Sequence, residues 1–341
     1  MLLTTTSHAR AGLLGNPSDG YFGKTIAFAF GDFAVTVTMY ESPELQLVPG
    51  VVDDSIFADV DALISEVNRF GYYGGIRLLK ATIRVFVEYC QEHGIALPPR
   101  NFTARYTSSI PRLVGLGGSS AICTAMFRSL MAFYEVDIPL EMIPTLCWQA
   151  ERRELGIHCG LQDRVIQMYG GTVFMDFEEK AFTTEGHGRY VPVDVSALPS
   201  IYLAYDPERA EFSGKYHSRL HVLFEENRAD IVSAMAEFAD LAQQGFDLLR
   251  AGKTEGIPEL INANFDLRNR VFSVREENAH MVFQARKSGA SAKFAGSGGA
   301  IVGTYEDEEM YSQLVSDLDQ IGCSVIRPRI SPAIVVPAAA S

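Results

Sequence analysis

The sequence predicts an α+β protein made of two domains. Its 341 residues, of which 47% are hydrophobic and 21% are charged, are enough for roughly two domains with a sizeable core. Segments with helical and with strand periodicity are interleaved, but they do not follow a regular βαβ alternation. In the second half, the order strand, helices, strand, helix, strand suits a split α+β domain. We therefore expect a first domain over residues 1–197 and a second over residues 198–341.

Strands open the first domain. From Thr25 to Met39, apolar residues alternate with small or polar ones on either side of Gly31-Asp32, and this pattern predicts a two-residue hairpin. The remaining elements expected in this domain are helices over 75–92, 119–133, 144–155 and 161–169 and strands over 101–107 and 172–177.

The second domain is expected to follow a turn-rich stretch over residues 183–199. Its expected elements are, in order, a strand over 201–205, a long helical region over about 218–249, helices over 259–272 and 281–287, a strand over 299–304, a helix over 307–320 and a closing strand over 324–329. The tail over 335–341 is expected to be frayed.

The composition excludes several classes of function. A net charge of −13 and the absence of any large basic cluster argue against a nucleic-acid partner. Apolar runs fall far short of the roughly 20 residues of a membrane helix, and the N-terminus lacks the core of a signal peptide, so we expect no membrane partner and a cytoplasmic location. The 5 cysteines are widely spaced and include no C-x-x-C pair, which favours reduced thiols. The oligomeric state is not predictable from the sequence.

The tripeptide Gly23-Lys24-Thr25 invites interpretation as a nucleotide-binding P-loop. That motif needs a glycine five positions before Gly23, where this chain has Ser18. It also needs a helix directly afterwards, whereas strand alternation follows here. The P-loop interpretation is therefore rejected.

A stronger phosphate-binding signal lies between residues 115 and 121. Gly115, Gly117 and Gly118 let backbone N–H groups face a ligand, and a helix begins at the residues that follow, Ser119, Ser120 and Ala121. Such a helix N-terminus suits a polyphosphate, and the hydroxyl of Ser120 is placed to reach a bound Mg²⁺ ion. Taken alone, the segment is explained equally well by a flexible glycine loop with a capping serine.

Two acidic residues flank a short glycine-bounded loop further along the chain. Glu151 lies near the end of one predicted helix, and Asp163 lies in the first turn of the next, where the helix dipole favours a negative charge. Two such carboxylates could have separate roles, one binding a metal ion and the other accepting from a substrate hydroxyl. For a single acid at a helix start, capping is the commoner role. His158 and Cys159 between them are interpreted as packing residues.

The order and spacing of three segments resemble the galactokinase–homoserine kinase–mevalonate kinase (GHMP) superfamily. Residues 10–19 are similar to its first motif, 115–121 to its phosphate-binding second motif and 292–299 to its third. The resemblance implies the family fold, with an N-terminal domain like the second domain of ribosomal protein S5, a ferredoxin-like C-terminal domain and an active site between them. It also implies ATP and Mg²⁺ as cofactors.

The resemblance also implies roles for individual residues. By position, Asp163 matches the acid that takes the proton of the acceptor hydroxyl, and Arg10 matches the cation beside it. Glu151 and Ser120 match contacts to Mg²⁺, and Asp19 matches a residue that binds sugar hydroxyls. Whether Asp163 acts as a full base or as an orienting charge stays open.

Within the superfamily, the chain resembles the glucuronokinases most. The likeness rests on 15–19, 21–25, 71–79, 156–164, 213–215 and 264–268. Where galactokinases place a glutamate near the sugar's C6 hydroxyl, this chain has Asn16, whose amide can donate a hydrogen bond to a C6 carboxylate without repelling it. Other candidates for binding the substrate are the cations Lys24, Arg77 and Lys215 and the tyrosines Tyr21, Tyr72 and Tyr73.

The resulting expectation is an ATP-dependent kinase that phosphorylates the anomeric hydroxyl of D-glucuronate. Two alternatives remain. One is a kinase for another sugar or uronic acid, such as galacturonate, arabinose or fucose. The other is a catalytically silent sensor of sugar and nucleotide on the same fold, which would need a broken site.

Overall fold

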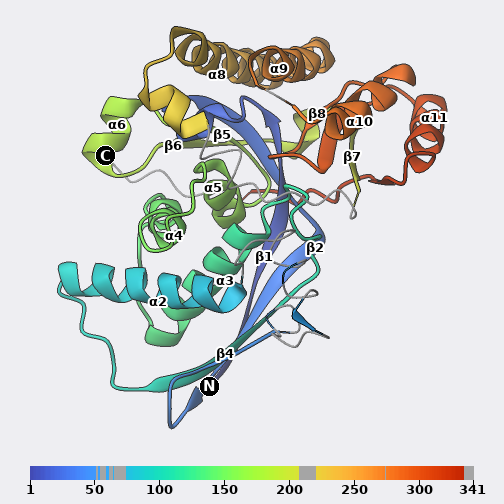
Figure 1. Ribbon diagram of the computed structural model, residues 1–341. Coiled ribbons are helices and arrows are strands. Elements are labelled where there is room, and N and C mark those ends of the chain that lie inside the picture. Colours follow the sequence, from blue (N-terminus) through green and yellow to red (C-terminus); the bar gives the residue numbers. More distant parts are fainter. Residues whose placement is uncertain are drawn as a thin grey trace.

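The chain folds around two β-sheets that are covered by helices (Figure 1). The computed structural model describes residues 1–50, 53, 59, 60, 64, 74–206, 220–272 and 274–333. Within this part of the chain, no helix is long and apolar enough to cross a membrane.

The first sheet contains six strands. They are β1 (Leu2–Leu14), β2 (Lys24–Ser42), β3 (Gln46–Val48), β4 (Asn101–Ser108), β5 (Thr172–Asp176) and β6 (Arg189–Val193). The order is β3-β4-β2-β5-β6, and β1 pairs with β2 along most of its length. The strand β2 is long enough to pair with β5 through its first residues and with β4 through its last ones.

The prediction of a hairpin turn at Gly31-Asp32 was wrong. Both residues lie inside the continuous strand β2. There His8 of β1 is opposite Ala34 and Ala9 is opposite Phe30, so the three residues 31–33 form a bulge. A bulge and a hairpin interrupt the apolar alternation in the same way, and only the distant partner strand β1 distinguishes them.

Four helices cover one face of the first sheet (Figure 1). They are α2 (Gly75–Glu92), α3 (Gly118–Tyr134), α4 (Ile143–Arg152) and α5 (Gln162–Tyr169), and all four confirm predicted helices. The rings of Phe86 and Phe127 meet edge to face between α2 and α3, with their centroids 5.6 Å apart. The stretch expected to be rich in turns also holds the end of α6 (Glu179–Glu185), β6 and a 3-10 turn over Val195–Ala197.

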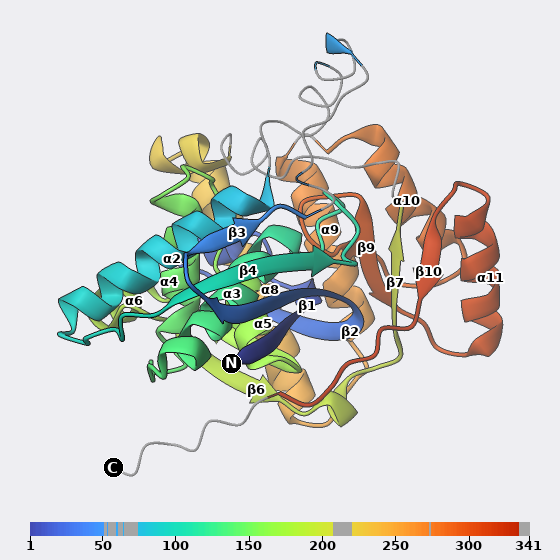
Figure 2. The same cartoon turned by 90° about the horizontal axis from the view of Figure 1, so that it is seen from below.

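The second sheet contains four strands in the order β10-β7-β9-β8. The chain runs through β7 (Ile201–Tyr205), α8 (Ala229–Arg250), α9 (Ile257–Val271), α10 (Glu276–Lys287), β8 (Lys293–Phe294), β9 (Ala300–Thr304), α11 (Glu308–Asp319) and β10 (Ser324–Ile326). This strand order and connectivity are those of a ferredoxin-like domain, as predicted. Figure 2 shows α10 and α11 beside this sheet.

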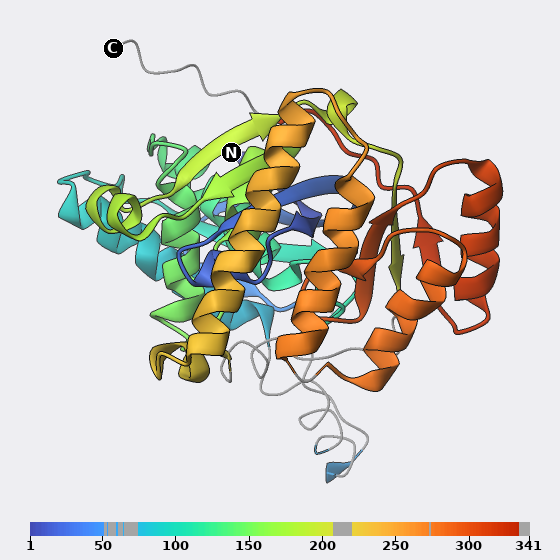
Figure 3. The same cartoon turned by 90° about the horizontal axis from the view of Figure 1, so that it is seen from above.

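The two halves of the chain are packed against each other. Helices α8 and α9 lie side by side (Figure 3), and α8 packs on β2 of the first sheet. In the same interface, the ring of Phe246 in α8 stacks on that of Phe174 in the neighbouring strand β5, with centroids 4.0 Å apart. The predicted limit between residues 197 and 198 falls between β6 and β7, which belong to different sheets.

Two further predictions concern the second half. The helical region expected over 218–249 is interrupted at residues 226–228, just before α8, and residues 218 and 219 lie outside the described residues. The tail over 335–341 also lies outside them.

Candidate active site

A large open cavity lies between the two domains, with an empty volume of about 1300 Å³ that includes the part open to solvent. It is lined by the residues after β1, by the loop before α3, by the loop between α4 and α5, and by Arg268, Gly296 and Ser297 of the second domain. All three segments that resembled kinase motifs therefore meet at one cavity.

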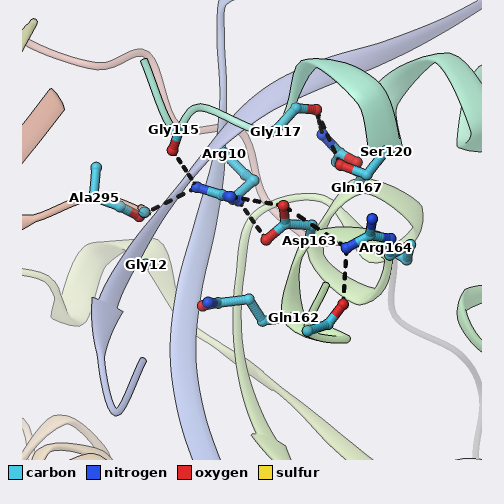
Figure 4. A network of polar contacts seen from close by, with 12 residues as sticks. Arg10, Gly12, Gly115, Gly117, Ser120, Gln162, Asp163, Arg164, Gln167 and Ala295 are labelled. Atoms are coloured by element: carbon cyan, nitrogen blue, oxygen red, sulfur yellow. Dashed lines mark hydrogen bonds and ion pairs between the residues drawn. The ribbon is translucent and has the colours of Figure 1, made fainter. Parts of the chain in front are cut away.

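Arg10 and Asp163 both line this cavity, and their side chains form an ion pair (Figure 4). Arg10 comes from β1, and its Nε and Nη2 donate to the two carboxylate oxygens of Asp163, each at 2.6 Å. Such a bidentate pair fixes the plane of the carboxylate. The Asp163 side chain keeps 16% of its surface exposed, so the carboxylate is oriented by arginine and still reachable from the cavity.

The same arginine holds the two glycine loops together. Its Nη1 donates to the backbone oxygen of Gly115 at 2.6 Å and to that of Ala295 at 3.2 Å. The loops touch so closely that a Cβ on Gly296 would lie 2.2 Å from the Gly115 oxygen. Glycine is therefore required at position 296 by a neighbouring backbone.

The N-terminus of α3 opens into the cavity. Gly117 caps this helix with a φ of 77°, and the helix start has no side-chain cap among the described residues. Gly118 and Ser119 line the cavity, whereas Ser120 and Ala121 are buried behind them. The hydroxyl of Ser120 donates to the Gly117 oxygen at 3.0 Å. Unpaired amides at a helix start are suited to binding phosphate.

Glu151 borders the cavity as a fully buried carboxylate at the end of α4. One of its oxygens, Oε2, accepts from Arg164, a charged partner that is itself buried. The other oxygen, Oε1, is buried and has no hydrogen-bond partner among the described residues. A buried carboxylate oxygen without a partner is costly, so this atom is poised to accept a ligand.

Asp19 is a third carboxylate of the cavity and is only 3% exposed. It accepts from the backbone N–H of Gln162 at 3.1 Å. Burial raises the pKa of Asp19 to about 6, against the effect of that hydrogen bond. Its carboxylate approaches the backbone so closely that a Cβ on Gly160 would lie 1.9 Å from Oδ2.

Asn16 also lines the cavity, beside Asp19. The other residues predicted to bind substrate lie elsewhere or outside the described residues. Tyr21 is buried against the ring of Phe224, and the Lys24 ammonium donates to Gln243 at 2.8 Å. Arg77 is on α2 and is not among the residues that line the cavity. Tyr72, Tyr73 and Lys215 lie outside the described residues.

Several residues of the cavity were not singled out for a role from the sequence. They are Gln162, Arg164 and Arg268, together with Tyr106 and the residues 110–113 before the glycine loop. Their patterns carry no signal of their own, because isolated arginines, glutamines and tyrosines are common on surfaces and in cores. Cys159 also borders the cavity, and burial raises the pKa of its thiol to about 12. A thiolate is therefore not available there near neutral pH.

Comparison with known proteins agrees with this arrangement. The profile of the GHMP kinases N terminal domain matches residues 77–171. Glucuronokinase 1 of Arabidopsis thaliana is 43% identical over 87% of this chain and 83% of its own length. Probable glucuronokinase 2 of the same plant is 45% identical over 87% of this chain and 82% of its own length.

Solved structures share the fold at low sequence identity. A Lin0012 protein from Listeria innocua superposes with a TM-score of 0.78 at 14% identity, covering 98% of this chain and 99% of its own. Lactococcus lactis galactokinase, solved with galactose, superposes with a TM-score of 0.72 at 14% identity, covering 98% of this chain and 95% of its own.

The fold and the cavity define a small-molecule phosphotransferase that uses ATP. The chain belongs to the GHMP kinases and, within them, to the glucuronokinase family.

Proposed function

We propose that this protein transfers the γ-phosphoryl group of ATP to the anomeric hydroxyl of D-glucuronate. The observation that carries the proposal is the bidentate pair between Arg10 and Asp163, two residues that both line the cavity. It is supported by the two plant glucuronokinases, which are 43% and 45% identical to this chain.

Asp163 is the residue that receives the acceptor hydroxyl. Arg10 orients its carboxylate, and each carboxylate oxygen has acceptor capacity beyond the one bond it takes from arginine. In this position Asp163 orients the sugar hydroxyl and accepts its proton as the oxygen attacks the γ-phosphorus. The guanidinium also limits the negative charge that accumulates there.

The nucleotide phosphates bind at the N-terminus of α3. The backbone amides of Gly118 and Ser119 face the cavity there and supply donors together with the positive end of the helix dipole. Tyr106 and Ile110 also line the cavity, and we assign this part of it to the rest of the nucleotide.

A Mg²⁺ ion fits beside these phosphates. The buried Oε1 of Glu151 is a hard oxygen without a hydrogen-bond partner among the described residues, and the hydroxyl of Ser120 lies in the first turn of α3. When bound, Mg²⁺ neutralises charge on the β- and γ-phosphates. Few protein ligands are needed, since Mg²⁺ is usually held by one or two carboxylates together with phosphates.

The sugar binds between Asp163 and Asn16. Asp19 offers acceptors for sugar hydroxyls, and so does the Oε1 of Gln162, which has no hydrogen-bond partner in the part of the chain that the structure describes. Asn16 offers an amide to the C6 carboxylate. Lys24, Arg77, Lys215, Tyr21 and Tyr72 stay predictions for substrate contacts.

The experiment that tests this proposal is a coupled ADP-release assay on the purified protein with a panel of sugars. D-Glucuronate is expected to give the highest kcat/KM, ahead of galacturonate, arabinose and fucose. Phosphorus NMR of the product is expected to show a phosphate on the anomeric carbon. A higher kcat/KM with another sugar would show that this other sugar is the substrate. Sugar-dependent binding of ATP without formation of ADP would point to a sensor.

A further inference from the structure

A buried lysine contacts Asn16, the residue proposed to bind the C6 carboxylate of the sugar. Lys293, at the start of the third motif, is only 1% exposed and does not line the cavity itself. Its ammonium donates to the backbone oxygen of Gly12 at 2.7 Å, to that of Phe294 at 2.9 Å and to the side-chain Oδ1 of Asn16.

These three contacts are all to uncharged oxygens. An ammonium carries three protons, so three acceptors match its protonated form. Burial, followed by the charges of Arg268 and Arg10, lowers the pKa of Lys293. An anionic substrate acts in the opposite direction, because a nearby negative charge favours the charged amine.

The contact with Lys293 decides which way the Asn16 amide points. Because Oδ1 accepts from the lysine, the NH₂ group occupies the other branch of the amide. Asn16 lines the cavity although it is only 2% exposed. We infer that the NH₂ group, which the lysine does not contact, is the part of the amide offered to a ligand. A freely rotating asparagine would offer a donor or an acceptor equally well.

We propose that Lys293 is a positioning residue that makes the Asn16 side of the cavity selective for an anionic C6 group. It fixes the amide as a donor and places positive charge behind it, so a carboxylate is favoured over a hydroxymethyl group. This inference rests on the proposed function. It extends that function by naming the residue that makes the site prefer a substrate with a carboxylate at C6.

The test compares D-glucuronate with D-glucose, which carries a hydroxymethyl group in place of the carboxylate. In Lys293→Met, which retains the length of the side chain, the KM for D-glucuronate is expected to rise about 10- to 100-fold, as for a lost hydrogen bond to a charged group. The inhibition constant of D-glucose and the KM for ATP are expected to change less than about threefold. Lys287→Met is the control, because that lysine is exposed on α10 and donates to Gln284 there.

A second variant tests the proposal even if Lys293→Met does not fold. Asn16→Asp keeps an acceptor for Lys293 and replaces only the donor, so D-glucuronate is expected to lose its advantage over D-glucose. An equal change for both sugars in Lys293→Met, or an unchanged preference in Asn16→Asp, would overturn the inference. A wild-type protein that ignores D-glucuronate would instead reject the proposed function itself.

Discussion

At the residue scale, three carboxylates share one cavity but differ in their surroundings. Asp163 pairs with Arg10 and Glu151 pairs with Arg164, whereas Asp19 accepts from the two amide groups of Gln162 and has no ion-pair partner among the described residues. In the proposed function, Asp163 accepts a proton, Glu151 binds a metal ion and Asp19 binds sugar hydroxyls. Burial raises the pKa of Asp19 to about 6.

This raised pKa predicts a pH dependence. As the pH rises through about 6, Asp19 loses its proton in the folded protein and becomes able to accept from sugar hydroxyls, so kcat/KM for the sugar is expected to rise. Between the ordinary pKa of 3.8 and about 6, the folded state binds a proton that the unfolded chain has released. The free energy of unfolding is therefore expected to fall as the pH rises through this window.

Asp19→Asn is the variant that isolates this group. It removes the titration, so both the rise in kcat/KM near pH 6 and the fall in unfolding free energy are expected to be reduced. The measurements are pH profiles of kcat/KM and of denaturant unfolding for the two proteins. A rise of the same size in Asp19→Asn would assign it to another group.

At the element scale, the site depends on two glycine loops that touch. The Gly115 oxygen accepts from Arg10 and faces Gly296 across a gap too narrow for a side chain. The turn before α3 requires a positive φ at Gly117, which favours glycine. The loops therefore position Arg10 as well as the N-terminus of α3.

Gly296→Ala is expected to separate these loops. A Cβ would lie 2.2 Å from the Gly115 oxygen, so the backbone must shift and Arg10 with it. We expect a loss of roughly 1–3 kcal/mol in unfolding free energy, as for overpacking, together with a lower kcat. Gly31→Ala is the control, because the atom nearest to a Cβ there would lie at 3.8 Å and Gly31 does not line the cavity. Equal kcat in both variants would contradict this role of the loops.

Much of the secondary structure was predictable from the sequence, for a physical reason. The helix Gly75–Glu92 has one apolar face over its whole length, so local periodicity determines it. The bulge at Gly31-Asp32 depends on its pairing with β1, and β6 is a five-residue strand that exists because β5 pairs with it. Contacts between distant segments are not visible in a local pattern.

At the scale of the whole molecule, the cavity is complete only when both domains are in place. Arg268 of α9 donates to the backbone oxygens of Gly296 and Ser297, each at 2.7 Å, and it lines the cavity. Arg10 of the first sheet reaches across to Ala295. The third motif is thus held from both sides.

Arg268→Lys is expected to loosen the third motif. A lysine side chain is shorter and lacks the planar fork of donors with which arginine reaches the backbone oxygens of both Gly296 and Ser297. We expect a loss of about 1–3 kcal/mol in unfolding free energy and a higher KM for ATP. Arg270→Lys is the matched control, since that arginine lies on the same helix in an exposed pair with Glu237. An unchanged KM for ATP in Arg268→Lys would show that its hold on the loop does not matter for binding.

The site was predictable only where the order of residues along the chain is informative. Arg10, Asp163, Glu151 and the glycine loop were identified through their order along the chain. The contacts of Lys293 with Gly12 and Asn16 join residues 281 and 277 positions apart, so only the folded chain reveals them.

The most direct test of the account is the turnover of Asp163→Asn with ATP and D-glucuronate. Asp230→Asn serves as a matched control, because Asp230 also lies in the first turn of a helix and is bound by both arms of an arginine, but on the surface. The account predicts that Asp163→Asn folds, binds ATP and loses kcat by about 10²–10⁴, whereas the control keeps its activity. Comparable turnover in Asp163→Asn and the wild type would contradict it.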